Sequence, residues 1–125
     1  MELELYLEAT DVTPEVHFNL TENKFSIRGR SMPEDTEKYY NVLIKWLNEK
    51  LRNESVSASI DIALDYYNTG TFIRLMAIFN LLHELNEAGN SIKVHWICEA
   101  DDEDNIADGE SFKDVVKVPF YIIEV

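Results

Sequence analysis

The chain has 125 residues, of which 46% are hydrophobic, and a formal net charge of −13 at neutral pH. This length suits one compact domain with its own core, so we expect a single domain over residues 1–125. The negative charge excludes binding that depends on attraction to nucleic acid or anionic membranes, and it favours neutral or basic partner surfaces. The single cysteine cannot form an internal disulfide, which fits a cytoplasmic protein.

The N-terminal third of the chain predicts three strands. Residues 3–8 alternate leucines with polar or aromatic residues, which is typical of a half-buried strand, and we place this strand at a sheet edge. The same segment has no basic region and no long apolar run, so we expect neither secretion nor membrane insertion. Residues 15–20 and 24–30 alternate on either side of a polar turn and predict a hairpin, in which Gly29 indicates a bulge or exit turn.

A helix start follows at Ser31-Met32-Pro33-Glu34. Serine is a favoured N-cap, proline fits the first turn, and a glutamate three residues after the serine completes a capping box. We expect this helix to extend to about residue 52, because apolar residues recur there at helical spacing. After a polar break, residues 56–67 are rich in β-branched and aromatic residues, and part of this segment, around residues 57–64, predicts a central strand.

The second predicted helix begins near residues 69–71 and ends before Gly89-Asn90. Its apolar side chains cover much of the circumference instead of forming one stripe. Such a helix is either buried on several sides, here between the sheet and the first helix, or it buries part of its surface against another protein. The composition leaves both alternatives open.

The C-terminal part predicts two strands with an acidic segment between them. Residues 91–98 predict a buried strand, and residues 118–123 predict an edge strand. We interpret the acidic residues 99–110 as a solvated loop, followed by a short helix over residues 111–116. Together the elements predict a mixed α/β (α+β) fold, with a sheet of about five or six strands and two main helices and a short third packed on it.

No pattern in the chain predicts catalysis. There is no nucleophile-elbow motif, no phosphate-binding glycine loop and no Cys/His pairing at a recognisable spacing. The histidines lie in separate predicted elements, so we interpret them as structural residues. Asp101-x-Glu103-x-Asn105 resembles the start of a calcium-binding loop, but Ile106 stands where that loop needs glycine. We therefore expect no enzymatic activity, no metal and no cofactor.

The junction Asn68-Thr69-Gly70-Thr71 is the strongest candidate site. It supplies an N-cap residue and two hydroxyls at a helix start, where backbone N–H groups lack intrahelical partners. A purely structural cap accounts for these residues. Alternatively, a phosphate on threonine would place about −1.5 to −2 charges against those N–H groups, within reach of Arg74. The residues by themselves are compatible with both interpretations.

Two motifs and a core pattern resemble a known family over nearly the entire chain. The motifs are the helix start Gly29-x-Ser31-x-Pro33-Glu34 and the junction Tyr66-x-Asn68-Thr69. These features are similar to the SiaC family of bacterial biofilm-regulation phosphoproteins. The remaining similar positions belong to the pattern of core residues: Thr13-Pro14, Trp46, Asp61, Ile78-Phe79, Leu81-Leu82, Val94-His95-Trp96 and Pro119-Phe120.

The resemblance implies a STAS-like fold, as in sulfate transporters and anti-sigma-factor antagonists, and a non-enzymatic role in partner switching. A GHKL-type serine/threonine kinase would phosphorylate Thr69, and a PP2C-type phosphatase would reverse this. The unphosphorylated form would bind and activate a diguanylate cyclase, which raises cyclic-di-GMP. The runner-up acceptor is Thr71. The residues expected to bind the partner are Asn68, Gly70, Thr71, Phe72 and Arg74.

One departure and two alternatives accompany this resemblance. The family commonly has two serines after the acceptor, whereas Gly70 and Thr71 follow Thr69 here. One alternative is an anti-sigma-factor antagonist that sequesters a kinase-type anti-sigma factor. The other is a small-ligand- or metal-binding domain that uses the histidines or the acidic residues 99–110.

Overall fold

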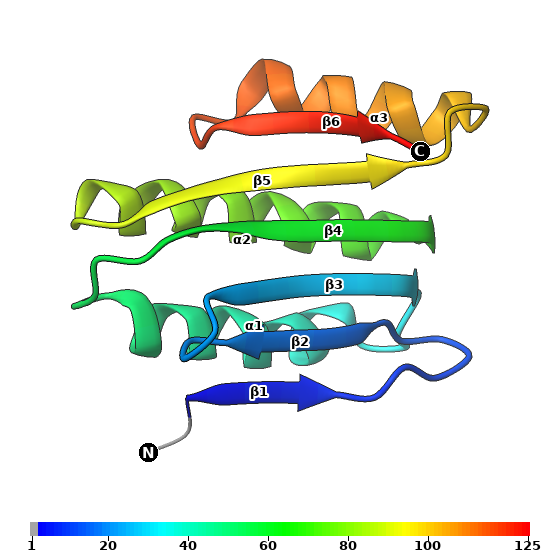
Figure 1. Cartoon of the computed structure of the whole chain (residues 1–125). Helices are drawn as coiled ribbons and strands as arrows, with labels where there is room; N and C mark the ends of the chain where they lie inside the picture. Colours follow the sequence, from blue (N-terminus) through cyan, green and yellow to red (C-terminus); the bar gives the residue numbers. More distant parts are fainter. Residues whose placement is uncertain (1–2) are drawn as a thin grey trace.

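The computed structural model describes residues 3–125, which form a six-stranded mixed sheet and three helices (Figure 1). In chain order the elements are β1 (Glu4–Leu7), β2 (Glu15–Asn19), β3 (Lys24–Ser31), α1 (Thr36–Leu51), β4 (Ser57–Tyr67), α2 (Thr69–Glu87), β5 (Ser91–Cys98), α3 (Glu103–Val115) and β6 (Phe120–Glu124). The strands follow one another across the sheet from β1 to β6. The pairs β1–β2 and β2–β3 are antiparallel, and the pairs from β3 to β6 are parallel. The mixed α/β class and the two edge strands are confirmed.

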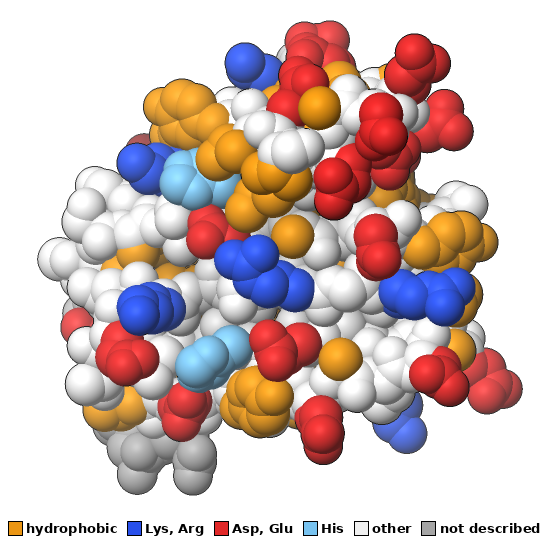
Figure 2. All heavy atoms as spheres, turned by 45° about the vertical axis from the view of Figure 1, so that its right-hand side comes forward, with side chains coloured by type: hydrophobic (Ala, Val, Ile, Leu, Met, Phe, Trp, Pro, Cys, Tyr) orange, Lys and Arg blue, Asp and Glu red, His pale blue; other side chains and the backbone are white. Residues whose placement is uncertain are grey.

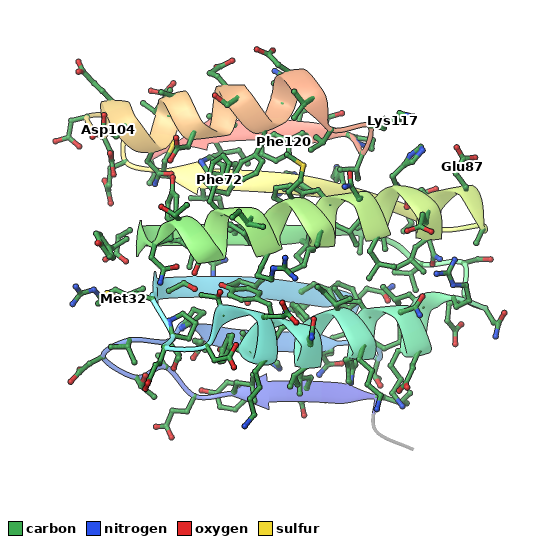
Figure 3. All side chains as sticks on the ribbon, turned by 180° about the vertical axis from the view of Figure 1, so that it is seen from behind. Met32, Phe72, Glu87, Asp104, Lys117 and Phe120 are labelled. Atoms are coloured by element: carbon green, nitrogen blue, oxygen red, sulfur yellow. The ribbon has the colours of Figure 1, made fainter. Side chains whose placement is uncertain are left out.

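All three helices cover one face of the sheet, so the described residues form two layers (Figures 1 and 3). The other face is open, and basic and acidic side chains lie close together on it (Figure 2). At its centre, Asp61 on β4 accepts from His95 on β5 at 3.0 Å and lies 3.7 Å from the guanidinium of Arg28 on β3. A polar face of this kind follows from the alternation in β4, where the other side chains are buried under the helices.

The predicted N-terminal hairpin is confirmed. β2 and β3 pair antiparallel with Phe18 opposite Phe25, and both rings are buried beneath α1. The predicted bulge is also present, because the register between β3 and β4 shifts after Gly29. Gly29 has a φ of 113°, a conformation that residues with a side chain rarely adopt.

The predicted start of the first helix is wrong by several residues. Ser31 is the last residue of β3 and is paired with Tyr67 of β4, so its backbone is extended. The N-cap of α1 is Asp35, whose carboxylate accepts from the backbone N–H of Lys38 at 3.0 Å. The pairing between β3 and β4 therefore overrides the local capping-box pattern at Ser31.

The apolar helix α2 lies in the middle of the helical layer. Its buried side chains, which include Leu75 and Phe79, join the core above the sheet. α1 packs along one flank, as predicted, and α3 covers the other flank, where Phe72 stacks on Phe112 with ring centroids 4.3 Å apart (Figure 3). Two neighbouring helices thus explain why α2 is apolar on several sides. Within residues 3–125, no helix is both long and apolar enough to cross a membrane.

The prediction of a solvated loop over residues 99–110 is wrong, because α3 begins within it. Asp102 is the N-cap, and its carboxylate accepts from the backbone N–H of Asn105 at 3.1 Å. Asn105, Gly109 and Phe112 face the core, whereas the acidic residues Glu103, Asp104 and Glu110 are exposed on the outer side of the helix. Gly109 lets α3 approach the sheet closely, since a Cβ atom there would lie 2.6 Å from Cδ1 of Trp96.

Candidate functional site

The candidate site is the junction between β4 and α2. β4 ends at Tyr67, α2 begins at Thr69, and Asn68 between them is the N-cap with extended backbone dihedrals. The side-chain oxygen of Asn68 accepts from the backbone N–H of Thr71 at 2.8 Å. This capping bond satisfies one of the N–H groups that a helix start leaves without an intrahelical partner, so the structural role considered for Asn68 is present.

The two hydroxyls of the junction lie in opposite environments. Thr69, the first residue of α2, is exposed. Thr71 is 0% exposed, and its hydroxyl donates to the backbone oxygen of Ser31 at 2.9 Å. The structure thus corrects the expectation that Thr71 belongs to a partner-facing surface, because its side chain is enclosed by β3 and α1. Of the two candidate acceptors, only Thr69 is exposed.

A buried network of hydroxyls holds Thr71 in place. The Ser31 hydroxyl lies 2.9 Å from the Thr71 hydroxyl and 2.6 Å from the Tyr40 hydroxyl. Burial raises the pKa of the Tyr40 phenol, so this group stays protonated. The network joins β3, α1 and the first turn of α2, which fixes the position from which Thr69 projects.

A hollow of about 240 Å³ lies beside Thr69. It is lined by Tyr67, Asn68, Thr69, Phe72 and Asp108. Asp108 comes from α3, and it accepts a hydrogen bond from the Tyr67 hydroxyl at 2.5 Å. Burial, together with this bond to a carboxylate, raises the pKa of the Tyr67 phenol. Asp108 is not among the residues predicted for this site, because the sequence pattern places it in a solvated loop. The helical spacing of Asn105, Gly109 and Phe112 was the available signal.

The remaining predicted site residues are dispersed around the junction. Gly70 faces α1, since a Cβ atom at this position would lie 2.6 Å from the Thr36 hydroxyl oxygen. Phe72 is partly buried against α3. Arg74, one turn after Gly70 in α2, is also partly buried. Ile73, which is not among the predicted site residues, is 53% exposed on the same helix. The surface around Thr69 is therefore partly apolar.

The histidines and acidic residues do not assemble a second site. His17 binds Glu4 at 2.6 Å, His95 binds Asp61, and His83 lies on α2, so each imidazole belongs to a separate contact. In the part of the chain that the structure describes, no group of three or more His, Cys, Asp or Glu residues is arranged to hold a metal ion. The junction therefore remains the candidate site among the described residues.

The fold and the junction define a class of protein: a two-layer α/β domain that presents one exposed hydroxyl at a helix start and encloses its neighbouring hydroxyl in the core. Residues 7–125 match the model of a family described as SiaC family regulatory phosphoprotein. The chain therefore belongs to the SiaC family.

Relatives from Pseudomonas aeruginosa support this membership. An uncharacterized protein of strain UCBPP-PA14 is 25% identical over 119 residues, which is 95% of this chain and 94% of that protein. The crystal structure of apo-SiaC from P. aeruginosa has a TM-score of 0.84 and 26% identity, and the match covers 96% of this chain and 98% of the other. A second structure, diguanylate cyclase SiaD in complex with its activator SiaC, matches with a TM-score of 0.89 and 25% identity, over 97% and 99% of the two chains.

Proposed function

We propose that this chain is a non-enzymatic regulator whose unphosphorylated form binds and activates a diguanylate cyclase. Phosphorylation of Thr69 by a GHKL-type serine/threonine kinase would end the interaction, and a PP2C-type phosphatase would restore it. The observation that carries this proposal is the exposed Thr69 hydroxyl at the first position of α2 in a chain of the SiaC family. The activator role of P. aeruginosa SiaC toward SiaD supports the choice of a cyclase as the partner.

The helix start favours a phosphate on Thr69. In the kinase reaction, the γ-phosphoryl group would pass from a nucleoside triphosphate to the Thr69 hydroxyl oxygen. The β–γ phosphoanhydride bond would break, the nucleoside diphosphate would leave, and the hydroxyl proton would pass to a base on the kinase. The product carries about −1.5 to −2 charges. It would lie at the N-terminus of a helix of 19 residues, where the macrodipole and free N–H groups favour an anion. The modified chain should therefore remain folded.

The same phosphate would oppose partner binding. The surface around Thr69 includes the neutral residues Asn68, Phe72 and Ile73, and Asp108 of α3 adds a negative charge beside them. A phosphate dianion buried against a partner would lose its hydration without compensation unless the partner supplied cations. The net charge of −13 would add to the repulsion of an acidic partner surface. Loss of the complex on phosphorylation follows from these two costs.

Variants of Thr69 test the proposal. The chain is immobilised, and the captured diguanylate cyclase from native cells is assayed for cyclic-di-GMP synthesis with wild type, Thr69→Ala and Thr69→Asp. We expect Thr69→Ala to bind and activate normally but to resist labelling by the kinase. Thr69→Asp should bind at least about tenfold more weakly, because it brings an unpaired charge into the interface.

Thr71→Val is the matched control, because it removes a buried hydroxyl from the same turn. It should still be labelled on Thr69. Equal binding by Thr69→Ala and Thr69→Asp would contradict the switch, and capture of an anti-sigma factor in place of a cyclase would contradict the proposed output.

A further inference from the structure

The N-terminal half of α3 is attached to the sheet by polar bonds. The Tyr67 hydroxyl at the end of β4 donates to Asp108 at 2.5 Å and lies 3.3 Å from the side-chain oxygen of Asn105. The Asn105 amide donates to the backbone oxygen of Leu64 at 3.1 Å, and its backbone oxygen accepts from the Trp96 indole at 3.1 Å. These bonds connect the first half of α3 to β4 and β5.

The C-terminal half of α3 is attached differently, through aromatic packing. Phe112 is fully buried, stacks on Phe72 and contacts the rings of Phe79 and Trp96. Phe112 is therefore held by apolar contacts that a charge change at the surface does not reach. The polar attachment around Tyr67 is the part of α3 that a nearby charge can alter.

Thr69 faces the hollow in which Tyr67 bonds Asp108. Among the five residues that line this hollow, Asp108 is the only charged one, and it is anionic. A phosphate on Thr69 would therefore meet a carboxylate and no lysine or arginine inside the hollow. It would also meet the Tyr67 hydroxyl, a donor whose proton is retained at neutral pH.

We propose that phosphothreonine at position 69 takes the Tyr67 hydroxyl away from Asp108 and so weakens the attachment of the N-terminal half of α3 to β4. This inference rests on the proposed function, because it assumes that Thr69 is the acceptor. The phosphate dianion carries more charge than the carboxylate and is the stronger acceptor for one phenol proton. It also repels Asp108 across the hollow. The modification is thereby transmitted from α2 to α3.

The test uses the full chain with phosphothreonine built into position 69 during synthesis, so that the result does not depend on the kinase. Hydrogen exchange is measured for the backbone amides of residues 103–108 and, as an internal reference, for those of α1. We expect phosphorylation to accelerate exchange in residues 103–108 by about tenfold, as loss of one charge-assisted hydrogen bond predicts, and to leave α1 unchanged. Unchanged exchange in residues 103–108 would overturn the inference.

Two variants assign the effect to the Tyr67–Asp108 bond. In Tyr67→Phe the donor is absent, so the unmodified variant should already exchange as fast as the phosphorylated wild type, and phosphate should add little. In Asp108→Asn the acceptor remains but its charge is gone, so phosphate should accelerate exchange less than in wild type. Asp104→Asn, an exposed change at the start of the same helix, is the matched control and should behave as wild type. An equal response to phosphate in all four proteins would refute the role of the bond.

Binding of the captured cyclase to the same phosphorylated sample separates this inference from the proposed function. Loss of binding with unchanged exchange would refute the inference and retain the switch. Accelerated exchange with unchanged binding would retain the inference and refute the switch.

Discussion

Two threonines at the start of α2 show how environment separates a hydroxyl that stabilises the fold from one that is open to modification. Thr71 is enclosed, and its hydroxyl completes a buried network with Ser31 and Tyr40. Thr69 is exposed beside a hollow where the Tyr67 hydroxyl bonds α3. Each region combines a threonine with a tyrosine hydroxyl, so residue type does not distinguish them. Burial distinguishes the two regions, because a hydroxyl that is enclosed and hydrogen-bonded stabilises the fold but is not accessible to a kinase.

The largest expected difference between the two regions is in stability. Thr71→Val removes a buried hydroxyl and its bond to the backbone oxygen of Ser31, and we expect the free energy of unfolding to fall by about 1–3 kcal/mol. Thr69→Val changes an exposed position and should alter stability by no more than about 0.5 kcal/mol. Urea denaturation of both variants measures these changes in the free energy of unfolding. Equal losses would show that the buried network does not stabilise the junction.

A smaller effect is expected at Asn68, which joins the two regions. Asn68→Ala removes the capping bond to the Thr71 N–H and should cost about 0.5–2 kcal/mol of unfolding free energy. Asn68→Ser is the control, because serine also caps helices and should retain most of the stability. The capping assignment would be contradicted if the serine variant were as unstable as the alanine variant.

The smallest expected effect is visible only at alkaline pH. Burial raises the pKa of Tyr40 above its ordinary value of 10.0. At pH values above 10.0 the Tyr40 phenol loses its proton in the unfolded chain but keeps it in the folded chain. The free energy of unfolding therefore falls as pH rises. One retained proton lowers this free energy by about 1.4 kcal/mol at pH 11.

The matching variant is Tyr40→Phe, whose loss of stability between pH 9 and pH 11 should be smaller than that of wild type by about this amount. Thermal or urea unfolding at the two pH values measures the loss. Identical pH profiles would show that Tyr40 ionises in the folded chain.

Much of the sheet was predictable because its signals are local. Alternation over residues 3–8 and 15–30 predicts β1 and the hairpin, and β5 matches its predicted bounds. The N-cap at Asn68 and the start of α2 were likewise predictable, because capping depends on residues close in the chain. These local signals predict that Thr69 lies at a helix start without any tertiary contact.

The errors arose where distant contacts decide the conformation. Ser31 has the local features of an N-cap, but pairing with β4 keeps it in β3. The acidic stretch before residue 110 lacks an apolar stripe, and α3 forms there because Asn105 and Gly109 pack on the sheet. The helical spacing of Asn105, Gly109 and Phe112 can indicate the helix, but the contact of Asp108 with Tyr67 depends on how that helix docks on the sheet.

Gly70 has a consequence for how much information the junction can carry. No side chain fits at this position without displacing Thr36, and Thr71 is enclosed, so the exposed part of the turn offers one modifiable oxygen. Under the proposed function each molecule is therefore in one of two states, with no intermediate degree of phosphorylation at this turn. A graded cellular output would then reflect the proportion of modified molecules in the population, and intact-mass measurement of the one-phosphate form would report that proportion directly.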